Sequence, residues 1–310
     1  MRLLLLGSAA GGGFPQWNCS CVNCSRVREG RIRAQARTQA QVLVCPSAGP
    51  RFLINASPDL RIQILSTPSL APVKAPRDTP IAGVVLTSAD VDCVAGLLHL
   101  REFQPLHIYA TPSVRRILLE DNHIFAVLDR ANPPVVWHDI PRNTWFSFAD
   151  SGSGGVPTSS RCLGVPLGGA YPHYVSEHLR RLLPREEAVI GLVVAEGNKQ
   201  IFYAPSLPAC SDEWKDCVQR SDLCLLDGTF WDDRELITAG VGSKTAREMG
   251  HIPLSGPGGL LKQCDFAKRG RCVLIHINNT NPVLDEESPE HREVRQAGWE
   301  IAYDGMELEL

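Results

Sequence analysis

The stretch that decides the fold is Val84-Val-Leu-Thr-Ser-Ala-Asp-Val-Asp-Cys-Val-Ala-Gly-Leu-Leu98. Its first residues form a short apolar run typical of a buried strand, and its last residues have the composition of a helix. Between them lies a polar turn with Ser88, Asp90 and Asp92 at alternate positions, followed at once by Cys93. The stretch therefore predicts a buried strand that carries polar side chains at its carboxyl end and leads into a helix.

This polar turn has two interpretations. Two carboxylates and a thiol at the end of a strand can converge on a metal ion. In the plainer interpretation, Asp90 or Asp92 caps the helix that follows. The spacing favours neither, so both stay open.

Working outward, apolar runs bounded by turn residues predict further strands. These are residues 2–6, 40–44, 51–55, 81–87, 107–110, 189–194, 200–204, 223–226, 272–277 and 299–303. Helices are predicted at 58–65, 94–102, 114–121, 212–219, 245–249, 258–263 and 289–296, with Ser57 and Ser288 as N-caps before prolines. We expect hairpin-like strand pairs in the first half, then strand–helix alternation, and at 151–155 a surface loop or a domain midpoint. The pattern fits an α/β protein with two sheets faced by helices.

Two other predicted strands end in chemically active side chains. Asp227 closes the apolar run that starts at Cys224, and His276 ends another apolar run, just before a row of asparagines. A histidine on an apolar strand is usually a hydrogen-bonded core group, but its place at a strand end favours a ligand here. His251, after a short helix, either orients this site by a hydrogen bond or marks the end of that helix.

Cys19, Cys21 and Cys24 form a C-x-C-x-x-C cluster near the N-terminus. Three thiolates so close in sequence can meet on one ion at about 2.3 Å each, which suits tetrahedral zinc. The alternative is a run of free thiols in a loop. We expect a zinc knuckle at about residues 18–25, whose fourth ligand comes from elsewhere in the chain.

Composition narrows the class of protein. The chain has 310 residues and a net charge of −3, so it carries no basic footprint for nucleic acid. No apolar stretch approaches the roughly 18 residues of a membrane span. Eleven scattered cysteines, several in apolar runs, are typical of a reducing compartment, and we expect a cytoplasmic protein. A G-x-S-x-G elbow, a Walker A motif and a G-x-G-x-x-G turn are all absent from the sequence.

Longer motifs carry a family resemblance. The segments 7–24, 55–59, 226–231, 247–251 and 276–282 closely resemble the pyrroloquinoline quinone (PQQ) biosynthesis protein B family, and the resemblance runs the whole length. That family belongs to the metallo-β-lactamase superfamily. The resemblance implies a four-layer αβ/βα sandwich of two mixed sheets flanked by helices, formed by one domain over residues 1–310.

The resemblance also implies a ligand set. Residues 88–93 lie where the superfamily has H-x-H-x-D-H, so Ser88 and Asp90 replace histidines, Asp92 matches, and Cys93 replaces the last histidine. His276 falls on the superfamily's final histidine ligand, and no carboxylate stands at 202–205 for a bridging aspartate. The cysteine cluster resembles a structural zinc site associated with dimers. A relative's histidine ligand is replaced by Asn279, so the fourth ligand is Asn279, His276 or water.

The implied function is PQQ synthesis, by metal-dependent hydroxylation of the tyrosine ring in the cross-linked glutamate–tyrosine precursor. Asp90, Asp92, His276 and Cys93 would hold an ion, with iron preferred over zinc or manganese. Asp227 and His251 would orient the substrate or relay protons. Other pathway proteins would be partners of a homodimer. The alternatives are a carrier that helps PQQ or its precursor towards the periplasm, and hydrolysis, which the missing histidines disfavour.

Overall fold

The computed structural model describes residues 1–102, 105–129, 135–148, 159–264 and 270–310. The chain divides into two compact units, each discontinuous in sequence. Unit 1 comprises Met1–Leu6, Gln41–Lys199 and Gly305–Leu310, and unit 2 comprises Gly7–Ala40 and Gln200–Asp304. A single domain over 1–310 stays a prediction. The loop predicted at 151–155 lies outside the described residues.

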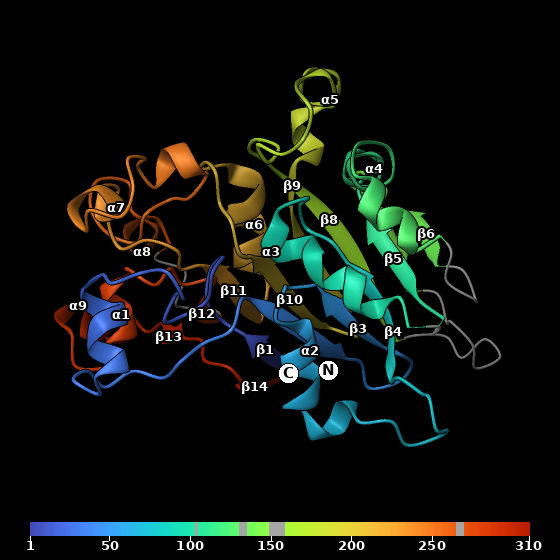
Figure 1. The fold of residues 1–310 in the computed structure, drawn as a ribbon, viewed down its shortest axis with the longest axis horizontal. Coiled ribbons are helices and arrows are strands. Elements are labelled where there is room, and N and C mark those ends of the chain that lie inside the picture. Colours follow the sequence, from blue (N-terminus) through green and yellow to red (C-terminus); the bar gives the residue numbers. More distant parts are fainter. Residues whose placement is uncertain (103–104, 130–134, 149–158, 265–269) are drawn as a thin grey trace. The chain divides into compact units, whose positions relative to one another are not determined.

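One seven-stranded sheet has the order β14-β1-β2-β3-β4-β5-β6. Its strands are β1 (Arg2–Gly7), β2 (Gln41–Cys45), β3 (Arg51–Ile54), β4 (Ile81–Val85), β5 (His107–Ala110), β6 (Val136–Asp139) and β14 (Glu307–Glu309). The interior strand β4 is fully buried and pairs in parallel with both β3 and β5 (Figure 1). Burial on both faces explains why its sequence is apolar without alternation.

The expected run of hairpins in the first half is wrong. In the first half β2 and β3 pair antiparallel, whereas β3, β4, β5 and β6 are parallel. Helices lie between consecutive parallel strands: α2 (Leu60–Leu65) after β3, α3 (Val91–Val94) after β4 and α4 (Pro112–Arg116) after β5. A parallel pair needs such a crossover, so these helices decide the strand direction.

The other seven strands have the order β13-β12-β11-β10-β9-β8-β7. In unit 1, β7 (Trp145–Ser147), β8 (Ser160–Gly168) and β9 (Val189–Glu196) pair antiparallel. In unit 2, β10 (Lys199–Ala204), β11 (Leu223–Asp227), β12 (Arg271–Ile275) and β13 (Glu300–Ile301) pair in parallel. The described residues thus form two mixed sheets with helices, and the α/β prediction is confirmed.

The remaining helices are α1 (Val22–Arg28), α5 (Glu177–Leu182), α6 (Asp212–Arg220), α7 (Glu235–Thr238), α8 (Leu260–Gln263) and α9 (Pro289–Gln296). Ser288 caps α9 as predicted, because its Oγ accepts a hydrogen bond from His291 N at 3.0 Å. The Ser57 cap is wrong: α2 begins after Asp59, and Ser57 Oγ instead accepts from Asp59 N in the preceding turn. The proline between them sets that extra turn before the helix.

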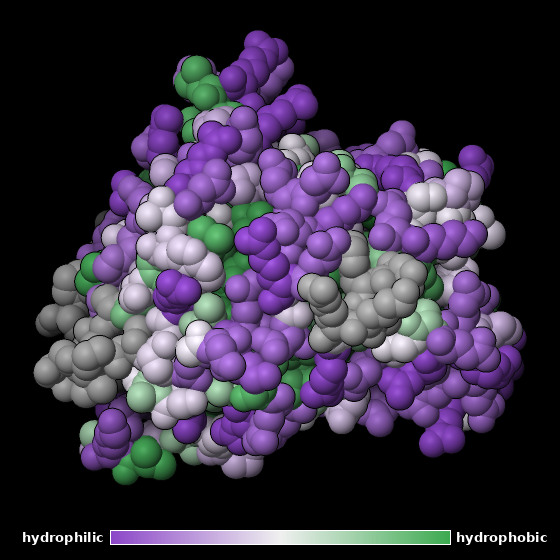
Figure 2. All heavy atoms as spheres, turned by 180° about the vertical axis from the view of Figure 1, so that it is seen from behind, coloured by the Kyte–Doolittle hydropathy of each residue, from purple (hydrophilic) through white to green (hydrophobic). Residues whose placement is uncertain are grey.

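The two ends of the chain meet in unit 1. Strand β1 pairs antiparallel with β14, and Leu310 N donates to Met1 O at 3.2 Å (Figure 1). Figure 2 shows a face on which hydrophilic side chains predominate and hydrophobic ones are scattered. Within the described ranges, every helix is too short or too polar to cross a bilayer.

Candidate functional site

Asp227 and His276 occupy one sheet edge in unit 2. Strands β11 and β12 are parallel neighbours in which Asp227 pairs with Ile275, so His276 is the first residue beyond that pair (Figure 1). Parallel strands bring their carboxyl ends to the same edge, which is why two residues far apart in sequence meet here. His276 also has a left-handed backbone, with φ of 60°, a conformation that non-glycine residues rarely adopt.

Asp227 is a fully buried carboxylate with four hydrogen bonds. Its Oδ2 accepts from Leu207 N at 2.9 Å and from His251 Nδ1 at 2.8 Å. Its Oδ1 accepts from Thr229 N at 3.0 Å and Thr229 Oγ1 at 2.7 Å. An ionised carboxylate has about four acceptor positions, so these four hydrogen bonds occupy all of them.

The surroundings of Asp227 stabilise its ionised form. Burial is the largest single influence and would raise the pKa of this carboxyl, but His251, His276 and Thr229 together outweigh it through their charge and hydrogen bonds. The net effect lowers the pKa of Asp227 below its usual value. The hydrogen bonds around Asp227 thus suit a carboxylate anion.

The two histidines lie face to face beside this carboxylate. The rings of His251 and His276 are 5.4 Å apart between centroids and 22° from parallel, and Phe230 packs its edge against His251. Thr229 Oγ1 lies 2.8 Å from His276 Nδ1 and 3.1 Å from His251 Nδ1. We call Asp227, Thr229, His251 and His276 the Thr229 network; its acid and two imidazoles lie close enough to hold an ion together.

The cysteine cluster (Cys19, Cys21 and Cys24) is assembled in the same unit. Its sulfur atoms lie within 4.8 Å of one another. Helix α1 starts directly after Cys21, and Arg28 NH1 donates to Cys19 O at 2.5 Å, which ties the loop to that helix. Burial raises the pKa of Cys21 to about 12, whereas for Cys19 hydrogen bonds from the cluster and Asn279 outweigh burial and lower the pKa.

Asn279 faces all three sulfurs. Its Nδ2 lies 3.2 Å from Cys19 Sγ, 3.5 Å from Cys21 Sγ and 3.3 Å from Cys24 Sγ. The backbone of this loop is held by Asn23, whose Nδ2 donates to the carbonyl oxygens of Asn279 and Asn281 at 3.2 and 3.0 Å. Of the predicted fourth ligands, Asn279 is the side chain that the fold brings to the cluster.

The polar turn of the deciding stretch lies in unit 1. Ser88 Oγ donates to Asp90 Oδ2 at 2.8 Å, and Asp90 N donates back to Ser88 Oγ at 3.2 Å. Asp90 stands at the N-cap of α3, but its side chain makes no capping hydrogen bond there. Burial, then the charges of Asp92 and Asp90, raise the pKa of Cys93 well above its usual value, so this thiol stays protonated.

The predicted residues thus fall into three sets. Among the residues that the structure describes, groups of three candidate ligands are formed by Cys19, Cys21 and Cys24 and by Asp227, His251 and His276. Asp90, Asp92 and Cys93 form no such group by themselves and belong to unit 1, whereas His276 belongs to unit 2. One ion held by Asp90, Asp92 and His276 therefore stays a prediction.

Two polar residues of the site were not predicted from the sequence. Thr229 is the hydroxyl that joins both histidines to Asp227, and its only signal is its place two residues after Asp227. Glu235 is buried; its Oε2 accepts from Trp231 N at 2.6 Å and its Oε1 from Thr280 Oγ1, next to Asn279. Burial raises the pKa of Glu235 to about 7. Glu235 directly follows other charged residues in the sequence, a pattern that is typical of a solvent-exposed surface.

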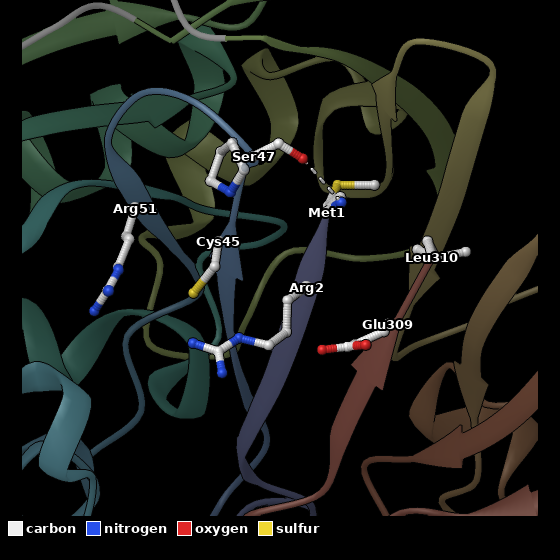
Figure 3. Close-up of a pocket in the computed structure, with 8 residues that line it drawn as sticks. Met1, Arg2, Cys45, Ser47, Arg51, Glu309 and Leu310 are labelled. Atoms are coloured by element: carbon white, nitrogen blue, oxygen red, sulfur yellow. Dashed lines mark hydrogen bonds between the residues drawn. The ribbon is translucent and has the colours of Figure 1, made fainter.

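A surface pocket in unit 1 offers no competing site. It is lined by both chain ends and by Cys45, Ser47 and Arg51 (Figure 3). Arg2 pairs with Glu307 at 3.4 Å and Arg51 donates to Ser69 O at 2.6 Å, so its cations already have partners. None of the predicted site residues lines this pocket.

Comparison with known proteins shows the superfamily to which the fold belongs. A family model described as beta-lactamase superfamily domain matches residues 50–277. The chain is also similar to a diphosphatase of the PhnP family, with a TM-score of 0.66 and 19% identity over 100% of this chain and 98% of the other, which shows the shared fold. The protein thus has a β-lactamase-superfamily fold.

Closer relatives define the family. The chain is 42% identical to coenzyme PQQ synthesis protein B from Pseudomonas entomophila and to that from Azotobacter vinelandii, over the whole of both chains. It is 38% identical to Zn²⁺-bound PqqB from Methylobacterium extorquens, with a TM-score of 0.89 and full coverage of both chains. The chain therefore belongs to the coenzyme PQQ synthesis protein B family, as its motifs predicted.

Proposed function

We propose that this protein acts in coenzyme PQQ synthesis as a metal-dependent enzyme, which hydroxylates the tyrosine ring of the cross-linked glutamate–tyrosine precursor. Full-length relatives that bear the name of this synthesis support the pathway. The observation that carries the enzymatic role is the Thr229 network, where an ionised, buried carboxylate orients imidazoles at a sheet edge. Such an arrangement is typical of catalytic sites rather than of a passive core.

The available donors fit a divalent ion. His276 would supply an imidazole, and Asp90 and Asp92, at the start of α3, would supply oxygen donors. Cys93 is the weakest candidate, since burial and the charges of Asp92 and Asp90 raise the pKa of its thiol. A ferrous ion at these residues would supply the dioxygen chemistry of non-haem iron oxygenases, and zinc or manganese would compete for the same donors.

Asp227 and His251 have a separate role in this proposal. The Asp227 carboxylate accepts from His251 Nδ1, so a neutral His251 has its lone pair on Nε2. An imidazole held in this way can take the phenolic proton of the substrate and return it later. Asp227 fixes the ring and stabilises the cation that forms when His251 is protonated.

We further propose that the cysteine cluster holds a structural zinc ion. The three sulfurs face one amide, and turning that amide about its Cβ–Cγ bond presents Asn279 Oδ1 in place of Nδ2. Three thiolates and one oxygen complete a tetrahedral set. The zinc in the M. extorquens relative supports zinc as the ion. We also propose that this zinc site supports dimer formation. The protein itself is proposed to be cytoplasmic.

A carrier is the second candidate. The presence of Cys93 where the superfamily has a histidine and the absence of a carboxylate in Phe202-Tyr-Ala-Pro205 point away from a loaded dinuclear centre. A protein with a reduced metal site would bind PQQ or its precursor without turnover. The same features argue against hydrolysis, which in this superfamily needs those ligands.

Dioxygen consumption distinguishes enzyme from carrier. Protein reconstituted anaerobically with ferrous iron, and supplied with ascorbate as a two-electron reductant, should consume dioxygen when it receives the cross-linked precursor. Mass spectrometry should show that the precursor gains one oxygen atom per hydroxylated ring, while the second oxygen atom is released as water. His276→Ala should abolish this, whereas His178→Asn, on the exposed face of α5, should not. Tight binding of PQQ with no turnover would establish the carrier instead.

A further inference from the structure

The Thr229 hydroxyl has one more close polar neighbour than it has hydrogen-bonding positions, because His251 Nδ1, at 3.1 Å, adds to three nearer atoms. Its Oγ1 lies 2.7 Å from Asp227 Oδ1, 2.9 Å from the His276 carbonyl oxygen and 2.8 Å from His276 Nδ1. A hydroxyl has one proton and two lone pairs. The carboxylate and carbonyl oxygens only accept, so both compete for that one proton.

The contact between Thr229 Oγ1 and His276 Nδ1 determines which ring nitrogen of His276 carries the proton. Were His276 Nδ1 unprotonated, three lone pairs would face a single O–H at 2.7 to 2.9 Å, and two of these contacts would be repulsive. A protonated Nδ1 turns one of these repulsive contacts into a hydrogen bond, because it donates to a lone pair of Thr229 Oγ1, and only the competition between the two acceptor oxygens remains. In a neutral imidazole the other nitrogen, Nε2, then carries the lone pair.

We propose that Thr229 is a positioning residue, whose hydroxyl holds His276 as the Nδ1–H tautomer and so directs Nε2 towards a metal ion. The hydroxyl contacts both the ring and the carbonyl of His276, so it fixes the side chain and the left-handed backbone together. The tautomer follows from the hydrogen bonds alone, while the role toward the metal rests on the proposed function.

His251 also carries its proton on Nδ1, and it contacts the other oxygen of the Asp227 carboxylate. Its Nδ1 donates to Asp227 Oδ2 at 2.8 Å, so both imidazoles direct Nδ1–H toward the Asp227–Thr229 pair. The competing arrangement is an ion bound among Asp227, His251 and His276 themselves. An ion on the Nδ1 atoms would displace the hydrogen bonds of Thr229, so the two arrangements predict opposite effects of removing its hydroxyl.

The tautomer can be measured without any metal at the site. Two-bond ¹H–¹⁵N correlation spectra of ¹⁵N-histidine-labelled protein, at pH about 8.5, well above the ordinary imidazole pKa of about 6.5, separate the two neutral tautomers. The His276→Gln variant assigns the signal. We expect Nδ1–H in the native protein and in Thr229→Ser, and a gain of Nε2–H in Thr229→Val. Thr280→Val, which removes a buried hydroxyl bonded to Glu235 instead, should leave the signal unchanged.

Metal affinity gives the second readout. Manganese(II) prefers oxygen and imidazole over thiolate, so its titration followed by electron paramagnetic resonance reports this site rather than the cysteine cluster. Loss of an outer-shell partner of a ligand costs about 10–100-fold in affinity, which we expect for Thr229→Val but not for Thr229→Ser or Thr280→Val.

Each result has a defined meaning. An Nε2–H tautomer of His276 in the native protein would refute the inference, and this result does not depend on the stability of Thr229→Val. An unchanged tautomer in Thr229→Val would refute it as well. Tighter manganese binding by Thr229→Val would overturn it in favour of an ion among Asp227, His251 and His276. An Nδ1–H tautomer with no manganese binding by any protein would retain the tautomer but refute the proposed metal function.

Discussion

Asn279 Nδ2 lies 3.2 Å from Cys19 Sγ, although 260 positions separate the two residues in the chain. The contact joins the loop that follows β12 to the N-terminal cysteine cluster. A zinc ion at this cluster would therefore connect two distant segments of unit 2, and its loss would affect both.

Cys21→Ser should remove this zinc. Elemental analysis is expected to give about one zinc per native chain at the cluster and almost none in the variant, because a serine hydroxyl is a poor zinc ligand at neutral pH. We expect the dimer to be lost with it, measured by light scattering. Cys210→Ser, an exposed cysteine outside the cluster, is the control. A monodisperse, metal-free dimer of Cys21→Ser would contradict the role of zinc in assembly.

Asn279 can be tested separately from the thiolates. Asn279→Ala removes the amide that faces all three sulfurs, and we expect zinc affinity to fall by about tenfold or more, in line with the loss of one hydrogen bond or ligand to a charged group. Asn279→His should retain affinity, because imidazole is a good zinc ligand. Competition with a chromophoric chelator measures both. Equal affinity in native protein and Asn279→Ala would mean that water completes the site.

Asp227→Asn should damage both stability and activity. The amide NH₂ group would face N–H donors from Leu207, His251 or Thr229, which costs on the order of 1–3 kcal/mol for each mismatched bond. Urea denaturation measures this loss. With His251 no longer oriented, dioxygen consumption should fall by about 100-fold or more. A fully active, equally stable variant would show that Asp227 is neither an orienting group nor a structural one.

The stability contributed by Asp227 should depend on pH in the acid range. Because its pKa is lower in the folded chain than in the unfolded one, its contribution is present above the unfolded value of about 3.9 and is lost as the pH falls through the folded pKa. Denaturation of native protein and Asp227→Asn from neutral to acid pH should therefore give converging free energies of unfolding. A constant difference would contradict the lowered pKa.

Glu235 should have the opposite pH dependence. Burial raises its pKa to about 7, above the unfolded value of about 4.3, so its contribution is complete below the unfolded value and is lost as the pH rises through 7. The loss should be on the order of 3 kcal/mol. Glu235→Gln, which can still accept from Trp231 N, should lack this slope between pH 5 and 8 in metal-free protein. Parallel curves for the two proteins would show that Glu235 is ionised throughout.

The sequence alone predicted the apolar strands. The ranges predicted at 81–87 and 223–226 contain the buried strands β4 (Ile81–Val85) and most of β11 (Leu223–Asp227), and their β-branched or leucine-rich runs were enough to find them. Helix α1 and strand β8 were missed. Helix α1 starts among the polar residues of the cysteine cluster, and β8 contains Gly164 and Pro166, which weaken a strand pattern. Local propensity carries no information about such tertiary constraints.

The same division holds for the candidate site. Residue type and position at strand ends were enough to select Asp227 and His276, since parallel strands place such ends at one edge. Only the tertiary structure showed that Thr229 joins both histidines to Asp227 and that Asn279 faces the three sulfurs. These contacts depend on how a turn or a distant loop is oriented in space. Hydrogen bonds across tens or hundreds of residues leave no periodic pattern along the chain, so the fold had to bring the partners together before their chemistry could be seen.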